Sequence, residues 1–390
     1  MDEQERYELE KHDRERHIQR RKLKQKRIRQ IRKMRIWVYA VLILGLFLGA
    51  FGVYTYSSNS SKKSEAEESK EQVEEVKEQE DKEEEVYVEP EINIVMVGDI
   101  LLHEPVQESG KLADGTYNYD HLFQHVTEDI QAADIAIANQ EVILGGTEIG
   151  LSGYPNFNGP FEVGDALAKA GFNVVLHATN HTLDRGKQAI VNCMNFWKEK
   201  HSDVAVLGIF DSQEAYDHDI YVYEKDGMKI AILNYTYGTN GMPFPEDMPY
   251  ALALLDEKKV VSDIQRAKEL ADFVVVCPHW GTEYEHTEDE DQAYWTELFL
   301  EQGVNLVLGT HTHYIQPVEM LSDEKGHQML VYYSLGNFIN ATAESGSGTA
   351  DRMVGEMAEI TVARKENGEV YIKEYGVEPL SHNFCMAHRR

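Results

Sequence analysis

Five apolar runs of this chain each end in side chains that bind metal ions. The polar residues at their ends are Gly98-Asp99, Asn139-Gln140-Glu141, Asn180-His181, His279-Trp280-Gly281-Thr282-Glu283 and Gly309-Thr310-His311-Thr312-His313. Carboxylate, amide and imidazole groups together suit Zn²⁺, Mn²⁺ or Fe²⁺. The three cysteines, Cys193, Cys277 and Cys385, have no close ligand spacing, which argues against a disulfide framework and a cysteine zinc knuckle.

These side chains are expected to meet, because ligand sites of α/β sheets lie at the carboxyl ends of strands. His311 and His313 are two positions apart, so in an extended segment they point the same way and can serve one site, one per metal ion. The Glu141 carboxylate can bridge two cations. A pair of metals about 3.5–4 Å apart activates water and clamps a phosphate-like group. We therefore expect a cofactor of two divalent metal ions, Mn, Zn or Fe.

Each candidate has a simpler alternative. His103 follows a strand end, either as a ligand or as an ordinary loop histidine. Asn139 and Asn180 are also typical of turns. His279 is either a ligand or a core histidine beside a tryptophan. Asp184 directly precedes an expected helix, which favours an N-cap role, although we keep it as a candidate catalytic residue.

The elements that must position these side chains begin at residue 92, where strands and helices start to alternate. Continuous apolar strands joined by helices indicate an α/β fold with a mostly parallel or mixed sheet covered on both faces. Asp226-Gly227 between two apolar runs predicts a hairpin, so antiparallel additions are expected. Strands are expected at 92–100, 134–142, 172–181, 204–209, 273–281, 304–313, 329–339, about 354–364 and about 369–378, and helices at about 120–132, 161–171, 184–200, 258–270 and 290–302.

Residues 36–56 predict a transmembrane helix. They carry no charge over 21 positions, which as a helix at about 1.5 Å per residue spans roughly 31 Å, close to the thickness of the bilayer interior. Aromatic residues lie near both ends, as they do at membrane interfaces. A buried core helix would have a polar face at this length, and a signal peptide would have a shorter apolar stretch and a cleavage site. We expect an uncleaved single-pass anchor in the lipid bilayer.

The charge distribution sets the expected orientation. Residues 1–35 hold 14 Lys/Arg and 7 Asp/Glu of the totals of 38 and 68, so the remainder holds 24 and 61. The positive-inside rule makes 1–35 a basic cytoplasmic segment, which either contacts lipid or a partner or acts only as a topology signal. Residues 57–91 are too polar and acidic to bury a core and are expected to be a disordered stalk. Residues 92–390 then form an extracellular domain at the cell membrane.

Six motifs, in this order, resemble the CapA family of bacterial poly-gamma-glutamate capsule biosynthesis proteins, which is related to calcineurin-like metallophosphoesterases. The resemblance covers roughly residues 92–340. The motifs are Gly98-Asp99, Asn139-x-Glu141, Asn180-His181 with Asp184 and Gly186, His279-Trp280-Gly281 with Glu283, Gly309-x-His311-x-His313, and Tyr333-Ser334-Leu335-Gly336-Asn337-Phe338.

The resemblance implies a metallophosphoesterase-like sandwich of two mixed sheets flanked by helices, with a di-metal site. His181 would face a phosphate-like group as an acid or charge stabiliser. The protein would act in making, exporting or anchoring poly-gamma-glutamate beside membrane synthase subunits. By the same analogy, the metals would be held by Asp99 with His313, by Asn180 with His279 and His311, and by Glu141 as the bridge.

The chain departs from the family's pattern at some positions. Asp99-Ile100-Leu101 lacks the histidine of the usual Asp-x-His motif, and His103 lies four positions after Asp99. Gln140 stands where leucine is common, and Ala178-Thr179 precedes Asn180 where a second asparagine is commoner. The first departure removes one expected metal ligand.

Three functions therefore compete: a capsule biosynthesis or export component with a metal site, a metal-dependent hydrolase of phosphoesters or polymer ends, and a metal-free polymer-binding module. An acidic domain repels polyglutamate at long range, which favours a metal-centred contact with the polymer. The same repulsion argues against nucleic acid as a partner.

Overall fold

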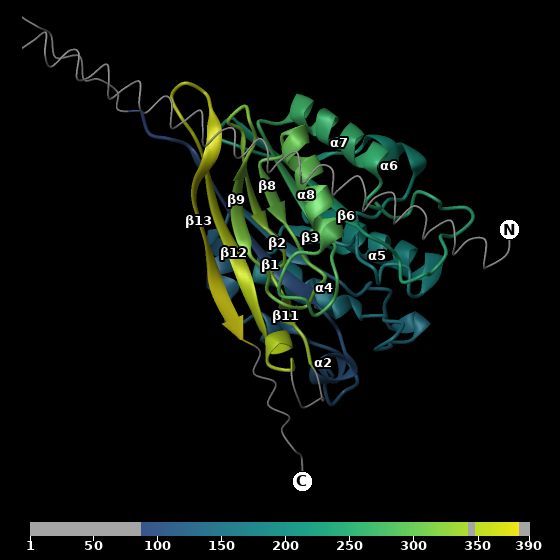
Figure 1. Ribbon diagram of the computed structural model, residues 1–390. Helices are drawn as coiled ribbons and strands as arrows, with labels where there is room; N and C mark the ends of the chain where they lie inside the picture. The colour runs from purple at the N-terminus through teal and green to yellow at the C-terminus, as the bar shows by residue number, and fades with distance from the viewer. Residues whose placement is uncertain (1–86, 342–347, 382–390) are drawn as a thin grey trace, which may run out of the picture. The chain divides into compact units, whose positions relative to one another are not determined.

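The computed structural model describes residues 87–341 and 348–381 (Figure 1). The expected cytoplasmic segment 1–35, transmembrane helix 36–56 and most of the stalk 57–91 lie outside the described residues. Within the described ranges, none of the helices combines the length and the apolar character that crossing a bilayer requires.

The first of two mixed sheets contains the strands that follow the earliest metal-capable motifs. Its strands β1 to β4 run parallel, whereas β12 is antiparallel to both β1 and β13. The strand order is β13 (Val370–Ser381), β12 (Val354–Arg364), β1 (Glu91–Ile100), β2 (Ile135–Asn139), β3 (Val174–Leu176) and β4 (Ala205–Leu207), and β11 (Asn337–Ile339) pairs with β1.

The second sheet has a parallel centre and antiparallel edges. Strands β6, β7, β8 and β10 run parallel, and β5 and β9 close the two edges in antiparallel pairing. The order is β5 (Tyr221–Lys225), β6 (Met228–Thr236), β7 (Phe273–His279), β8 (Leu306–Leu308), β10 (Gln328–Tyr332) and β9 (Val318–Ser322). The expected hairpin is formed at Asp226-Gly227, where both residues have positive φ.

Alternation along the strands builds the core in layers. On β1, Ile94 and Met96 point into the space between the sheets, while Val95 and Val97 point to the helical side. The helices on the first sheet are α2 (Glu104–Ser109), α3 (Thr127–Ala132), α4 (Phe161–Ala170) and α5 (Gly186–Lys200), and those on the second are α7 (Glu257–Leu270) and α8 (Glu290–Gln302). The expected fold of two mixed sheets flanked by helices is confirmed.

Local capping sequences fix the ends of the helices near the site. Asp289 and Gln292 form a capping box at the start of α8, and Gly303 ends it in the left-handed conformation with φ of 82°. Asp256 caps α7 through the Lys259 N–H. Because α8 follows the His279 loop and precedes β8, these caps fix the spacing between two of the metal-capable motifs.

The prediction of a single strand over residues 329–339 was wrong. These residues form two strands, β10 and β11, which belong to different sheets. Gly336 turns the chain between them with φ of 66°, and its carbonyl packs against Gly98 so closely that a Cβ on Gly98 would lie 2.0 Å from it. Because the chain crosses here from the second sheet to the first, Asn337 lies at the carboxyl end of β1.

Other differences concern short elements. The helix expected at 120–132 is a 3₁₀ turn, η1 (Asp120–Leu122), followed by the short α3. Five further short elements, which lack a long periodic pattern, were not predicted. They are α6 (Gln213–His218), η2 (Thr147–Ile149), η3 (Asp351–Met353) and the edge strand β9, together with α2.

Candidate metal centre

The metal-capable side chains meet at the carboxyl ends of the central strands of both sheets. Asp99 is the penultimate residue of β1, Glu141 lies two residues beyond β2, and His279 ends β7. His311 and His313 lie in the loop after β8. All five are buried. The expected convergence on one cavity is therefore what the structure shows.

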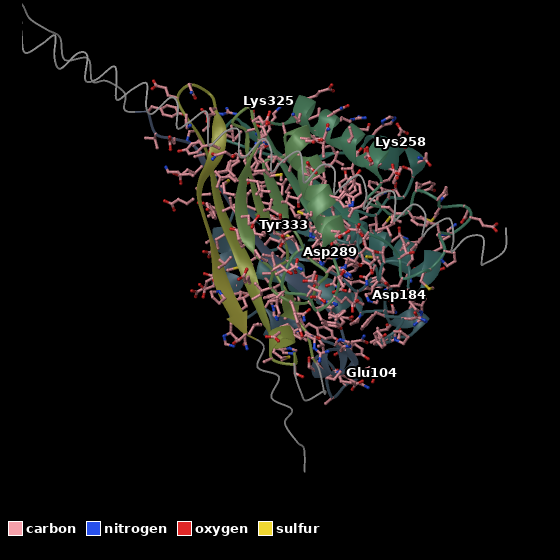
Figure 2. The ribbon with its side chains drawn as sticks, viewed as in Figure 1. Glu104, Asp184, Lys258, Asp289, Lys325 and Tyr333 are labelled. Atoms are coloured by element: carbon pink, nitrogen blue, oxygen red, sulfur yellow. The ribbon has the colours of Figure 1, made fainter. Side chains whose placement is uncertain are left out.

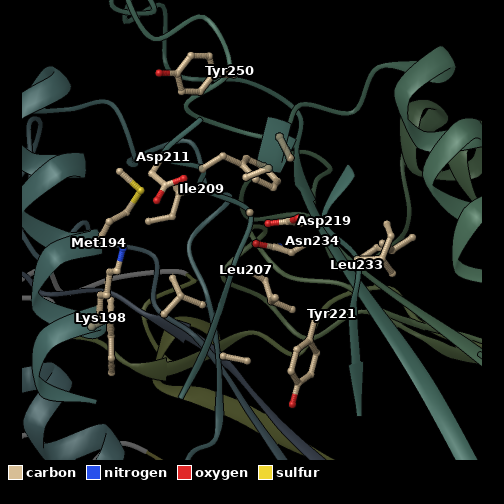
Figure 3. Close-up of a pocket in the computed structure, with 18 of the residues that line it drawn as sticks. Met194, Lys198, Leu207, Ile209, Asp211, Asp219, Tyr221, Leu233, Asn234 and Tyr250 are labelled. Atoms are coloured by element: carbon tan, nitrogen blue, oxygen red, sulfur yellow. The ribbon is translucent and has the colours of Figure 1, made fainter. Parts of the chain in front are cut away.

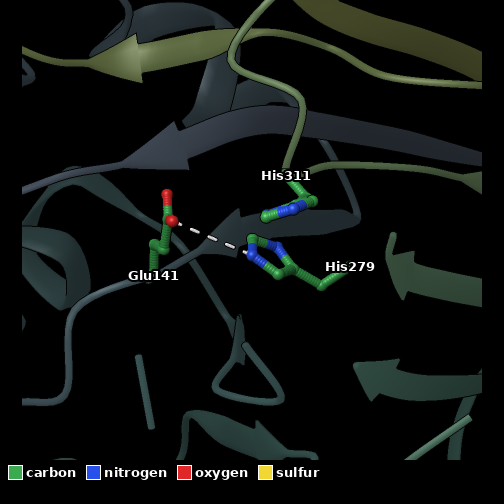
Figure 4. Close-up of side chains that lie close together, drawn as sticks. All are labelled: Glu141, His279 and His311. Carbon is green, nitrogen blue, oxygen red and sulfur yellow. Dashed lines mark ion pairs between the residues drawn. The ribbon is translucent and has the colours of Figure 1, made fainter. Parts of the chain in front are cut away.

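Glu141 lies at the middle of this cluster. Its Oε1 lies 3.8 Å from Nε2 of His279 and 3.8 Å from Nε2 of His313. Figure 4 shows Glu141 directed at the imidazole rings of His279 and His311. Neither carboxylate oxygen has a hydrogen-bond partner among the described residues, although the side chain is only 1% exposed. Since a buried unpaired carboxylate is costly, this arrangement is what a cation site requires.

Two overlapping sets of side chains have the spacing of metal ligands. One is Glu141, His279 and His311, and the other is Asp99, Glu141 and His313. Within each set, the candidate ligand atoms lie within 4.8 Å of one another. Because Glu141 belongs to both sets, the geometry suits two neighbouring cations that share one carboxylate.

Hydrogen bonds orient His313 toward this shared space. Its Nδ1 lies 3.0 Å from Oδ1 of Asn337 and 3.1 Å from Oδ2 of Asp99. Both partners accept, which assigns the Nδ1 proton to these bonds and directs Nε2 toward Glu141, where a bound cation would replace the Nε2 proton. A hydrogen-bond acceptor on the ring nitrogen that does not face the metal is typical of metal-binding histidines.

His279 and His311 are held by other contacts than His313. His279 has Nδ1 3.0 Å from Oγ1 of Thr310 and Nε2 2.9 Å from Oδ1 of Asn180. In the described part of the chain, Nδ1 of His311 and Oδ1 of Asn139 are buried without a partner. Each of these atoms can bind a metal ion, and the oxygen and imidazole set fits Zn²⁺, Mn²⁺ or Fe²⁺.

The ionisation of these groups follows from burial and from their neighbours. Burial, with added repulsion from Asp99 and Glu283, raises the pKa of Glu141. Burial lowers the pKa of His313, but the Glu141 and Asp99 charges outweigh it and raise this pKa to about 10. Burial and the neighbouring imidazoles lower the pKa of His279 and His311, which are neutral and hence able to bind a metal.

The loop after β8 carries backbone strain. His311 has φ of 102° and His313 has φ of 59°, both unusual for a residue other than glycine. The His311 N–H lies 3.3 Å from each carboxylate oxygen of Asp99, which holds the turn in place. The expected extended geometry of this pair was wrong, since β8 ends at Leu308 and the two rings enter the cluster from a turn.

Beside the cluster lies a hydrogen-bonded histidine and aspartate. Nδ1 of His181 lies 2.7 Å from Oδ2 of Asp184, which also accepts the Phe157 N–H at 2.8 Å. Asp184 lies in the loop before α5, whose N-cap is Arg185, so the N-cap interpretation of Asp184 was wrong (Figure 2). His181 directly follows Asn180, whose Oδ1 lies 2.9 Å from Nε2 of His279, so the pair lies next to the cluster.

His103 belongs to neither set of metal-capable groups. Its ring packs edge-on against Phe157 with centroids 5.3 Å apart, and the other side of Phe157 meets His181 at 4.8 Å. His103 therefore lies one aromatic ring away from the His181–Asp184 pair. It does not fill the place of the missing Asp-x-His histidine.

A family model described as "Bacterial capsule synthesis protein PGA_cap" matches residues 93–342, which include every motif of this cluster. The chain belongs to this family. The match confirms the resemblance to capsule biosynthesis proteins that the six motifs indicated.

Two curated proteins from Bacillus are similar to this chain. Capsule biosynthesis protein CapA of Bacillus anthracis is 27% identical over 259 residues, covering 64% of this chain and 60% of that protein. PGA biosynthesis protein CapA of Bacillus subtilis (strain 168) is 25% identical over 267 residues, covering 65% of each. The chain thus matches less than two thirds of the length of either relative. Among solved structures, the NAD nucleotidase of Haemophilus influenzae is 11% identical, with a TM-score of 0.48 over 75% of this chain and 57% of that chain.

Asn337 was not predicted as a site residue. It contacts His313 through Oδ1, and its Nδ2 donates to the Arg352 carbonyl at 3.0 Å. Asn139 was considered only as a turn residue or part of a motif, yet its Nδ2 donates to Oδ1 of Asp99 at 2.8 Å. Asn139 ends the apolar strand β2, which is the signal that singled out the other site residues, whereas Asn337 is the first residue of β11 and lacks that signal.

A separate cavity of about 1020 Å³ lies between α5 and the edges of the two sheets (Figure 3). Met194 and Lys198 line one side of it, and Tyr221 and Leu233 line the other. It shares no lining residue with the cluster around Glu141. The amide of Asn234 in its wall is satisfied by the backbone of Ala178 and Cys277. We therefore assign the chemistry to the cluster and not to this larger hollow.

Proposed function

We propose that this chain is a membrane-anchored component of poly-gamma-glutamate capsule formation or export, and that its cluster holds two divalent metal ions. One observation carries the metal site. Both buried oxygens of Glu141 face three imidazoles and a second carboxylate without a hydrogen-bond partner in the described structure. The names of the two Bacillus relatives support the capsule role.

The ligands divide into two groups around Glu141. When bound, the metals would act as Lewis acids that activate water and polarise a phosphoryl or carbonyl oxygen. The protein supplies the rigid frame, because His313 and His279 are each fixed by a hydrogen bond on one ring nitrogen. The proposed ligands are Asp99 and His313 for one ion, Asn180, His279 and His311 for the other, and Glu141 for both.

The proposed location depends on the sequence before the described domain. The uncharged residues 36–56 and the basic residues 1–35 support a single-pass anchor with a cytoplasmic N-terminus and an extracellular C-terminal domain. In that orientation the domain that holds the cluster would lie outside the cell, on the same side of the membrane as the capsule polymer. Its partners would be the polymer, the membrane synthase subunits and the lipid bilayer, with no role for nucleic acid.

A second candidate function is a metal-dependent hydrolase at the cell surface, acting on a phosphoester or on polymer ends. The His181–Asp184 pair favours it, since a structural metal site has no need of an oriented acid. Asp184 fixes the His181 Nδ1 proton, which leaves Nε2 to carry or release a proton. His181 would protonate the leaving group, and Asp184 would stabilise the positive charge on the ring.

Two measurements test these proposals. In cells whose only copy carries Glu141→Gln, capsule polymer is expected to fall sharply, and normal polymer would contradict a metal-dependent role. The hydrolase is tested on a chromogenic phosphodiester with added Mn²⁺. Turnover that is lost in His181→Ala would support the enzyme. The absence of turnover with any metal would leave the assembly or export role.

A further inference from the structure

Tyr284 forms part of the mouth of the metal cluster. Its ring centroid lies 5.8 Å from that of His313 and 5.6 Å from that of Tyr314. Its φ is 66°, and its N–H donates to the Thr312 carbonyl at 2.8 Å. A tyrosine held in a left-handed conformation and still exposed to solvent is placed there at a cost, which is typical of functional positions.

Arg352 packs against the ring of this tyrosine. Its guanidinium carbon lies 5.4 Å from the Tyr284 ring centroid. Its carbonyl accepts a hydrogen bond from Asn337, the same side chain that contacts Nδ1 of His313. The position of Arg352 is thus tied to the cluster through one shared residue. The Tyr284 ring centroid lies 5.4 Å from this guanidinium carbon and 5.8 Å from the His313 ring centroid. The distance from Arg352 to the His313 ring is therefore no greater than the sum of these two distances.

The charges at this mouth are otherwise acidic. Burial and the Glu283 carboxylate raise the pKa of Tyr284, whereas the Arg352 guanidinium lowers it, so charges of both signs act on this ring. Glu141 and Asp99 add further negative charge inside the cavity. An anionic ligand that approaches the cluster therefore meets attraction at Arg352 and repulsion at Glu283.

We propose that Arg352, supported by the ring of Tyr284, is a substrate-recognition residue that binds a carboxylate of the polymer next to the group held at the cluster. This inference rests on the proposed function. A guanidinium donates two parallel hydrogen bonds to a carboxylate, which gives both strength and orientation. A polymer with a carboxylate on every repeat can occupy Arg352 with one unit while the neighbouring link reaches the metal ligands.

The test is calorimetric titration of a γ-linked glutamate oligomer into the full-length chain with added Mn²⁺. We expect Arg352→Gln to weaken binding by about tenfold or more, and Arg352→Lys to weaken it less. Arg364→Gln is the matched control, because Arg364 pairs with Asp272 at the opposite end of β7 from His279. The same oligomer with its α-carboxylates amidated should bind the unaltered chain as weakly as the acidic oligomer binds Arg352→Gln.

Equal affinities for Arg352→Gln and Arg364→Gln, or no binding of the oligomer by the unaltered chain, would overturn the inference. Metal content measured on the same samples separates it from the proposed function. A chain that binds the oligomer through Arg352 but holds no metal would refute the metal site alone. A chain with full metal content and no dependence on Arg352 would refute the recognition residue alone. Thermal unfolding of each variant checks that Arg352→Gln is folded.

Discussion

Nε2 of His313 and Oε1 of Glu141 lie 3.8 Å apart, too far for a direct hydrogen bond and close enough to share a cation. The same oxygen is equally far from Nε2 of His279. One carboxylate oxygen thus faces imidazoles that come from two strand ends of the second sheet. The following predictions derive from this geometry and from the residues that support it.

Glu141→Gln should remove most of the stabilisation that metal binding gives to the folded chain. An amide is a weaker ligand than a carboxylate, and the substitution removes a buried carboxylate whose oxygens have no hydrogen-bond partner among the described residues. We expect added Mn²⁺ or Zn²⁺ to stabilise the unaltered chain by about 3 kcal/mol at a hundredfold excess over Kd, and to stabilise the variant far less. Without metal, the variant should be at least as stable as the unaltered chain. Thermal unfolding with and without chelator measures both effects.

Glu356→Gln is the control for that experiment, because Glu356 is also a partly buried carboxylate with one unpartnered oxygen in the described structure. It lies on β12 and belongs to neither metal-capable set. Its response to metal should match that of the unaltered chain. If both variants lost the same amount of stabilisation by metal, the loss could not be assigned to a metal ligand at Glu141.

Asn337→Ala should weaken metal binding although Asn337 is not a proposed ligand. It removes one of the two acceptors, the other being Asp99, that fix the Nδ1 proton of His313, and losses of such partners typically cost about 10–100-fold in affinity. Competition with a chromogenic chelator measures the change. Asn340→Ala removes a hydrogen bond to the same Arg352 carbonyl without contacting His313, so its affinity should be unchanged. If the two variants behave alike, the effect is one of loop structure.

Asp184→Asn tests the hydrolase candidate through a residue that does not bind metal. The amide cannot stabilise a protonated His181, so we expect phosphodiester turnover to fall by about 10²-fold or more while metal content is retained. Asp165→Asn is the matched control, since Asp165 contacts Nε2 of His201 at 2.6 Å on the surface. Unchanged turnover in Asp184→Asn would exclude proton transfer by His181.

His177 should make the metal-free protein less stable in acid. Its ring accepts a hydrogen bond from Trp197 at 3.0 Å, and burial lowers its pKa to about 3. The unfolded chain, with a pKa of about 6.5, takes up a proton that the folded chain refuses, so stability falls as pH decreases from about 6.5 toward 3. The slope from this group approaches about 1.4 kcal/mol per pH unit.

His177→Gln keeps an acceptor for Trp197 and removes the titration. Urea unfolding in chelator at about pH 7 and about pH 4.5 should show a smaller loss of stability for the variant than for the unaltered chain. His121→Gln, which replaces a histidine on the exposed side of η1, serves as the control. Identical losses for the unaltered chain and His177→Gln would show that His177 is protonated in the folded protein.

Much of the fold and site was predictable because strand ends are easy to recognise. Asp99, Glu141 and His279 each follow an apolar run, and the rule that such ends converge places them together without coordinates. The same rule brings His311 and His313 to the cluster from the loop after β8, but it does not predict their positive φ values, which arise from the turn that Asp99 holds. A turn of that kind depends on a contact between residues more than two hundred positions apart.

The crossing from β10 to β11 could not be predicted for a similar reason. Residues 329–339 are apolar throughout, and only the close contact of Gly336 with Gly98 divides them between two sheets. Asn337 reaches His313 as a result of that crossing. Its role was missed because its position depends on tertiary packing and not on the local pattern. The role of Arg352 was missed for the same reason, since η3 carries no periodic signal.

Elemental analysis of the full-length chain, compared with His279→Ala and His311→Ala, tests the central claim most directly. The account predicts close to two equivalents of a divalent transition metal in the unaltered chain and a clear loss in each variant, with His177→Gln retaining the full content. A folded, metal-free chain, or variants with the same metal content as the unaltered chain, would contradict it.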